Sequence, residues 1–128
     1  MSSATRRPLS QWSTTPGSRT WTAPGYARAH NNLGVALLAQ QNTDGAAAAF
    51  RAALDLDRRS VDALVNLAIA DERLGRRERA KEGLLRALTI DPRSALAHYN
   101  LGVLYDETGE AALALQHYRS FLDHASVE

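Results

Sequence analysis

The stretch His98-Tyr-Asn-Leu-Gly-Val-Leu-Tyr105 decides the fold, because related stretches precede it at a constant interval. His30-Asn-Asn-Leu-Gly-Val-Ala-Leu37 stands 68 residues earlier, and Leu64-Val-Asn-Leu-Ala-Ile-Ala-Asp71 lies midway, 34 residues from each. A fixed period of this length is typical of stacked repeats, in which each repeat packs only against its neighbours. The period therefore predicts a repeat array and not a mixed globular domain.

The composition favours helices. Hydrophobic residues make up 45% of the 128 residues and aromatic residues only 6%, so the helix formers Ala and Leu supply most of the apolar content. The chain has no Cys, which excludes disulfides and Cys-ligated zinc and gives no sign of an oxidising compartment. No apolar run is long enough to span a bilayer. We expect an all-α protein in the cytoplasm.

The net charge of +1 does not suggest nucleic acid binding, but the charge is unevenly distributed. Residues 1–26 contain Arg6, Arg7 and Arg19 and no acidic residue, whereas residues 95–128 contain Arg119 against five acidic residues. This asymmetry allows attraction between the tail and the C-terminal end, or head-to-tail association of two chains. Ordinary scatter of surface charge is the simpler interpretation.

Residues 1–25 hold three of the four prolines and many Ser, Thr and Gly residues, without a helical period. We expect a disordered or loosely attached tail there. Its Trp12 and Trp21 are unusual in a solvated segment and could fold back onto an apolar face. Three repeats of two helices each are expected to follow, at 27–60, 61–94 and 95–128.

Helix boundaries follow from capping and breaking residues. We expect the first helix to begin at Tyr26 and a second to be capped by Thr43 or Asp44. The remaining helices are expected at Val61 to Leu74, Glu78 to Ile90, Ala95 to Asp106 or Glu107, and Glu110 to about His124. Inward-facing residues are expected to include Leu33 in the first helix and Phe121 and Leu122 in the last.

Two kinds of residue recur at equivalent positions of the repeats. A small residue in each first helix lets the two helices of a repeat approach, and a large residue in each second helix fills the neighbouring space. The small residues are Gly34, Ala68 and Gly102, and the large ones are Phe50, Leu84 and Tyr118. Two further series are Leu33, Leu67 and Leu101, and Ala46, Ala80 and Ala114.

On these residues the chain resembles the tetratricopeptide repeat family, which has a 34-residue period and a Leu-Gly…Ala…Phe…Pro signature. The third repeat matches best, with Leu101, Gly102, Tyr105, Ala114 and Tyr118, and the resemblance covers residues 27–128. It implies three helix-turn-helix hairpins stacked as a right-handed α-solenoid. It also implies a protein that binds partners and is not an enzyme.

Several residues depart from the family pattern. His30 and His98 stand where Trp is frequent, Asp71 stands where Tyr is preferred, and Gln41 replaces the glycine that ends a first helix. Gly83, inside a helix, should cost about 1 kcal/mol relative to Ala. Apolar residues crowd the last helix and some should be exposed: Leu113, Leu115, Phe121 and Leu122. A larger parent protein, self-association through this helix, or a cap from a partner or the tail tryptophans would explain them.

The resemblance places a peptide-binding groove on the concave surface lined by the first helices. Asn32, Asn66 and Asn100 would form a ladder there, since side-chain amides can both donate to and accept from a peptide backbone. A purely structural role between helices is an equally good interpretation. The other residues expected to face the groove are Arg28, Asn31, Val35, Leu38, Asp62, Val65, Ile69, Glu72, Arg73, Leu96, Tyr99, Val103 and Asp106.

Members of the family that bind chaperones hold a C-terminal carboxylate with Lys and Arg side chains at set groove positions. In this chain those positions hold Asn31, Leu96 and Asn100. The resemblance therefore implies no tight binding of C-terminal EEVD-type tails.

The sequence offers no catalytic, metal or cofactor site. There is no Gly-rich phosphate loop and no Gly-x-Ser-x-Gly motif. We interpret His30 and His98 as packing residues, and His117 and His124 are seven residues apart, which is not the spacing of a metal pair. A basic cluster is interleaved with glutamates and is interpreted as a turn with salt bridges: Arg73, Arg76, Arg77, Arg79 and Lys81.

We therefore expect a protein–protein interaction scaffold that binds a peptide or partner helix in the groove. It could also form a homo-oligomer through the last helix; we expect no cofactor and no membrane contact, and consider nucleic acid unlikely as a partner. One alternative is an accessory segment of a larger enzyme of glycosyltransferase or sulfatase type. Weak binding of RNA or another anionic ligand by the basic cluster is a further alternative.

Overall fold

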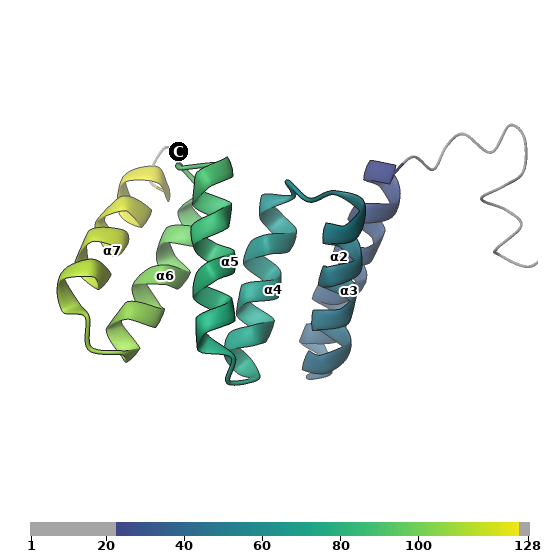
Figure 1. The fold of residues 1–128 in the computed structure, drawn as a ribbon, viewed down its shortest axis with the longest axis horizontal. Coiled ribbons are helices and arrows are strands. Elements are labelled where there is room, and N and C mark those ends of the chain that lie inside the picture. The colour runs from purple at the N-terminus through teal and green to yellow at the C-terminus, as the bar shows by residue number, and fades with distance from the viewer. Residues whose placement is uncertain (1–22, 126–128) are drawn as a thin grey trace, which may run out of the picture.

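A computed structural model of the chain describes residues 23–125. These residues form six helices and no strand: α2 (Ala23–Ala39), α3 (Thr43–Leu56), α4 (Val61–Arg73), α5 (Arg77–Ile90), α6 (Ala95–Glu107) and α7 (Ala111–Ala125). Figure 1 shows three hairpins, α2/α3, α4/α5 and α6/α7, stacked in a row in chain order. The predicted all-α stack is confirmed. The expected tail, residues 1–25, falls outside the described residues up to residue 22, including Trp12 and Trp21, whereas residues 23–25 are helical and not part of a loose tail.

Four helix starts differ from expectation, and two of them differ by one residue only, because α5 begins at Arg77 and α7 at Ala111. Helix α2 begins at Ala23 and not at Tyr26, so Pro24 lies in its first turn, where a missing N–H breaks no helical hydrogen bond. The cap of α3 is Asn42, whose Oδ1 accepts from the Gly45 N–H at 3.0 Å, so Thr43 is already helical and the prediction of Thr43 or Asp44 was wrong. Asn fits this position because its short side chain reaches the free N–H groups of the first turn.

Each turn inside a hairpin contains one residue with a left-handed backbone. Gly75 and Gly109 have φ of 80° and 83°, and Gln41 occupies the equivalent place with φ of 67°. A residue with a Cβ is strained in this region by roughly 1–2 kcal/mol. The first hairpin therefore makes the same turn as the other two at an energetic cost that they avoid.

The two helices of each hairpin meet at the predicted small and large residues. A Cβ on Gly102 would lie 2.7 Å from the Tyr118 ring, and one on Gly34 would overlap the Phe50 ring even more closely. In the second hairpin the large residue is only Leu84, and the small residue is correspondingly Ala68. Residue size on one helix therefore matches the space left by the other, which confirms the packing reason for this repeat.

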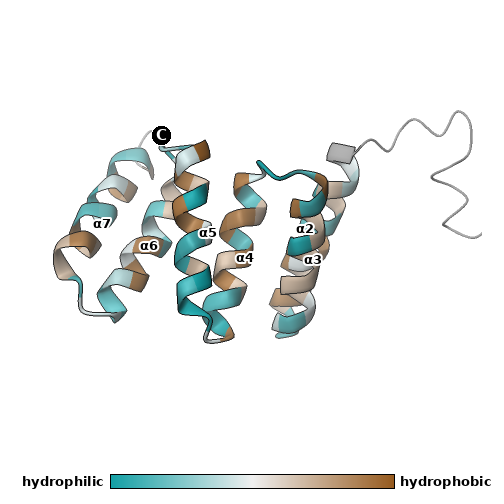
Figure 2. Ribbon diagram, viewed as in Figure 1, coloured by the Kyte–Doolittle hydropathy of each residue, from teal (hydrophilic) through white to brown (hydrophobic). Residues whose placement is uncertain are grey.

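Buried residues run along the interior of the stack. The main cluster joins the second and third hairpins through residues such as Leu64, Leu84 and Leu101, and a smaller cluster surrounds Phe50. Figure 2 shows apolar segments of the helices alternating with polar ones, as expected for helices covered on one side. Two expected inward residues are instead exposed: Leu33 is 51% and Leu122 61% accessible, because no described helix packs over them.

Asp71, which replaces an aromatic residue of the family pattern, is only 3% exposed near the end of α4. Its Oδ1 has no hydrogen-bond partner, and the nearest cation is Nη1 of Arg76 at 3.6 Å.

None of the helices within residues 23–125 is both long and apolar enough to cross a membrane.

The glycines provide a matched test of the packing. A Cβ on Gly83 would lie 3.7 Å from the Leu64 carbonyl oxygen, which is ordinary contact. We expect Gly83→Ala to stabilise the fold by about 1 kcal/mol, since Ala is the better helix former. Gly34→Ala should destabilise it by roughly 1–3 kcal/mol, because the buried Phe50 ring must move. Urea unfolding checks both signs, and stabilisation by Gly34→Ala would contradict the close helix crossing.

Candidate functional site

Two hollows lie along the first helices of the three hairpins. The larger, of about 200 Å³, takes its walls from α2, α4 and α6 and from the residue that caps α6. It is lined by Asn31, Val61, Asp62, Val65, Asn66, Ser94 and Leu96. The smaller, of about 20 Å³, lies where α4 and α6 meet above Leu84 of α5, and its walls include Ile69, Glu72, Asn100 and Val103. Nine of the sixteen residues predicted to face one groove line these two hollows.

The asparagine ladder is not uniform. Asn66 Nδ2 donates to Asn31 Oδ1 at 3.0 Å, which ties α4 to α2 across the first repeat boundary. Asn100 Nδ2 donates to the Leu96 carbonyl oxygen of its own helix at 2.8 Å. Asn32 is exposed. Asn66 and Asn100 therefore already have hydrogen bonds within the protein, but each amide keeps further hydrogen-bonding capacity.

Other predicted groove residues fall into two groups. Arg28, Val35 and Arg73 are exposed side chains on α2 and α4. Val65 lines the larger hollow but is only 2% exposed. Leu38 is half-buried and packs against the cluster around Phe50, so it belongs mainly to the core.

Aromatic side chains gather where α6 meets α7. The Tyr99 ring is 43% exposed and lies over Phe121 and Tyr118, with ring centres 5.2 and 6.1 Å away. The Tyr118 hydroxyl donates to Asp106 Oδ2 at 3.4 Å. Burial, followed by the nearby Asp106 carboxylate, raises the pKa of the Tyr118 phenol, so it stays a neutral donor.

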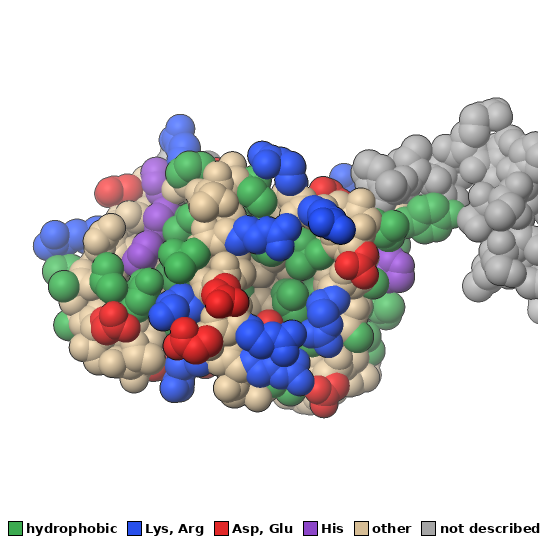
Figure 3. Space-filling model, viewed as in Figure 1, with side chains coloured by type: hydrophobic (Ala, Val, Ile, Leu, Met, Phe, Trp, Pro, Cys, Tyr) green, Lys and Arg blue, Asp and Glu red, His purple; other side chains and the backbone are tan. Residues whose placement is uncertain are grey.

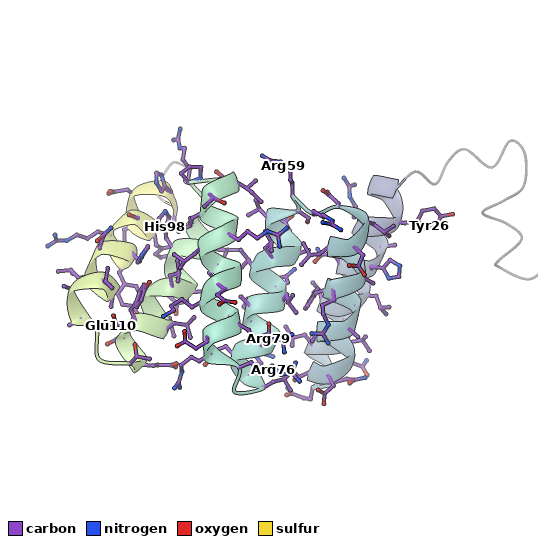
Figure 4. The ribbon with its side chains drawn as sticks, viewed as in Figure 1. Tyr26, Arg59, Arg76, Arg79, His98 and Glu110 are labelled. Atoms are coloured by element: carbon purple, nitrogen blue, oxygen red, sulfur yellow. The ribbon has the colours of Figure 1, made fainter. Side chains whose placement is uncertain are left out.

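The basic cluster is largely paired. Arg76 lies 3.6 Å from Asp71, Arg77 3.5 Å from Glu107 and Lys81 3.3 Å from Glu78. Figure 4 places Arg76 and Arg79 near the turn between α4 and α5, and Figure 3 shows basic and acidic side chains interspersed over this face. This mixture supports the interpretation as a turn with salt bridges.

A histidine cluster in the last hairpin was not predicted from the sequence. His98 and His117 are both buried, and their Nδ1 atoms are 3.0 Å apart. His124 stacks on His98, Tyr105 stacks on His117, and Figure 4 places His98 at the end of the hairpin opposite Glu110. The sequence held one signal. Position 117 is a histidine, whereas the equivalent positions of the other two repeats hold the small residues Ala49 and Gly83.

The hydrogen bonds fix the protons on this pair. His98 Nε2 lies 2.9 Å from the Pro92 carbonyl oxygen, and because a carbonyl can only accept, this nitrogen carries hydrogen. Neutral His98 then offers a lone pair at Nδ1, which accepts the Nδ1–H of His117. No group of three metal-ligating residues suited to an ion occurs within residues 23–125. Both rings are buried and hydrogen-bonded in the third hairpin, which agrees with the interpretation of His98 as a packing residue.

The His98–His117 pair predicts a dependence of stability on pH. Burial, and then the proximity of His98, lowers the pKa of His117 from its ordinary value of 6.5. The unfolded chain therefore takes up this proton more readily than the folded chain. The contribution of His117 to the free energy of unfolding is complete above about pH 6.5 and declines as the pH falls below it. We expect thermal melts to show this decline and His117→Asn to flatten it. His30→Asn, which leaves the pair intact, is the control; an equal slope in wild type and His117→Asn would contradict the assignment.

Comparisons with known proteins agree with this architecture. The family model for the tetratricopeptide repeat matches residues 18–61 and 65–126. The human protein O-mannosyl-transferase TMTC3 is 31% identical over 106 residues, which is 82% of this chain but only 12% of that protein.

Solved structures share the fold at lower identity. The first tetratricopeptide domain of Spaghetti (RPAP3), bound to the HSP90 peptide SRMEEVD, has a TM-score of 0.77 at 18% identity, covering 82% of this chain and 83% of that one. The Arabidopsis OM64 domain gives 0.77 at 17%, covering 80% and 85%. MamA gives 0.73 at 22%, covering 81% and 60%. The chain belongs to the tetratricopeptide repeat family.

Proposed function

We propose that this protein binds an extended segment or helix of a partner protein along the first helices of its three hairpins. The observation that carries this proposal is the larger hollow, whose walls come from α2, α4 and α6 together. A site built from three successive repeats suits a ligand that is long in one direction and crosses repeat boundaries. We place this binding in the cytoplasm, in keeping with the cysteine-free composition.

The chemistry of the groove walls supports recognition of a peptide. Leu96 is 60% exposed at one wall of the larger hollow, which gives an apolar contact for a partner side chain. Asp62 and the amides of Asn31 and Asn66 lie in the same hollow and can pair with peptide N–H and C=O groups. An apolar contact flanked by a few polar groups is the usual composition of a ligand site.

The charged residues favour a neutral or basic segment. Asp62 and Glu72 each line one of the hollows, and neither hollow contains a Lys or Arg side chain. Two structural relatives are bound to the acidic HSP90 peptide SRMEEVD. This chain instead places carboxylates in its hollows, so its partner segment should differ in charge from that peptide.

A second candidate function is favoured by the similarity to TMTC3. That protein is a mannosyl-transferase by name, and the matched region is about an eighth of its length. We accordingly consider that this repeat array could serve as a partner-binding segment of a larger glycosyl-transferring enzyme. The mass of the natural gene product tests this: a product near 13.9 kDa would exclude it, and a much larger one with a transferase domain would support it.

Paired Leu→Glu variants test the groove. Peptides selected from a display library on the wild type should lose at least about tenfold in affinity with Leu96→Glu, equivalent to about 1.4 kcal/mol, because a charge replaces the apolar wall of the hollow. The matched control is Leu85→Glu, at an exposed position on α5, which should leave affinity unchanged. Fluorescence anisotropy measures both, and equal effects of the two variants would argue against this groove.

The carboxylate-binding prediction has its own test. A peptide ending in EEVD should bind no tighter than the millimolar range, about −4 kcal/mol, because Asn31, Leu96 and Asn100 supply no cation for its terminus. Isothermal titration calorimetry, with a neutral peptide from the selection as positive control, provides the measurement. A micromolar dissociation constant for the EEVD peptide would show that other cations replace the missing ones.

A further inference from the structure

At each end of the stack, one side of the terminal hairpin has no described neighbouring repeat. Of the described helices, α7 contacts only α6, and α2 contacts only α3 and α4. A shift of 34 residues relates each repeat to the next, so the interior repeat boundaries show which positions a neighbouring repeat covers. The same positions can then be located at the two ends.

At the α6/α7 end, positions that are covered inside the stack are uncovered. Val65 and Ala87 of the second repeat are fully buried and belong to the cluster shared with the third, and Leu88 packs against that cluster. Their equivalents one repeat later are Tyr99, Phe121 and Leu122, which we call the C-terminal face. Tyr99 and Leu122 are exposed and Phe121 is partly exposed.

At the α2/α3 end the complementary positions are uncovered. Ala63 and Ala70 of the second repeat are buried, and so are their equivalents Ala97 and Leu104 in the third, together with Leu101. The corresponding residues of the first repeat are Ala29, Leu33 and Ala36, which we call the N-terminal face. All three are exposed.

We propose that the C-terminal face binds the N-terminal face of a second copy of this chain, so that copies stack head to tail. The contact reproduces the boundary that already joins the repeats within one chain. At the first boundary Asn31 bonds to Asn66, and the same register places Tyr99 against Asn32 of the second copy. The Tyr99 hydroxyl and the Asn32 amide are suited to a hydrogen bond there.

Charge favours head-to-tail stacking over a symmetric pair. Helices α6 and α7 carry Asp106 and Asp123 against Arg119, since Glu107 is paired with Arg77 of α5, whereas α2 carries Arg28 and no acidic residue. The two faces therefore attract each other, while two C-terminal faces would bring like charges together. A head-to-tail contact does not close on itself, so stacks can exceed two copies, and the peptide groove would continue from copy to copy.

Two charge-introducing variants test the stacking. Leu33→Glu blocks the N-terminal face and Leu122→Glu the C-terminal face, and both side chains are exposed, so folding should be retained. In sedimentation velocity over a concentration series, the full-length wild type should form species larger than a dimer, and each variant alone should remain monomeric. An equimolar mixture of the two variants should form a dimer and nothing larger, because only one pair of intact faces remains.

The remaining outcomes would overturn the proposal. A wild type that is monomeric at every concentration would show that the two faces do not bind each other. Self-association of Leu33→Glu alone would indicate a symmetric contact of C-terminal faces. Leu85→Glu on α5 is the matched control and should assemble like the wild type, and circular dichroism confirms that each variant keeps its helix content.

Discussion

The fold depends on the close crossing of the two helices within each hairpin. The glycine at 34 or 102 leaves space that an aromatic ring on the partner helix fills, and the Ala68–Leu84 pair makes the same contact with residues of intermediate size. Because the three crossings are alike, the hairpins have the same shape. Units of the same shape can then stack with one repeated contact, which places their first helices side by side.

This constraint connects the core to both proposed binding surfaces. The groove exists because α2, α4 and α6 are brought next to one another, and the Asn31–Asn66 hydrogen bond joins two of them directly. The N-terminal and C-terminal faces arise because the first and last hairpins each have a described neighbour on one side only. The histidine pair is a local variation in the third hairpin, where His98 and His117 fill the space between α6 and α7 with hydrogen-bonded rings.

The period predicted most of the fold, since recurrence at 34 residues identifies the positions that must pack alike. Helix number, the small–large crossings and the burial of His98 follow from that recurrence. The exceptions lie where the local context overrides the repeat. Leu33 is exposed although Leu101 is fully buried, because only Leu101 has a preceding hairpin among the described residues. The cap at Asn42 depends on the backbone at one position, which periodicity does not determine.

The candidate site was less predictable than the fold. Sequence spacing identified nine of the residues that line the two hollows, but it could not show that Asn66 and Asn100 hydrogen-bond within the protein, nor that Val65 is buried. Side-chain pairing depends on contacts between helices, and a single sequence does not specify them. The His98–His117 pair went unrecognised for the same reason, since its members are 19 residues apart on two helices.

The most direct measurement of the central claim is the footprint of a bound peptide on the backbone amides. In NMR spectra of the labelled protein titrated with a display-selected peptide, we predict chemical-shift changes concentrated in α2, α4 and α6 around Asp62, Asn66 and Leu96. Changes confined to α3, α5 and α7, with the amides around the larger hollow unmoved, would contradict binding in this groove.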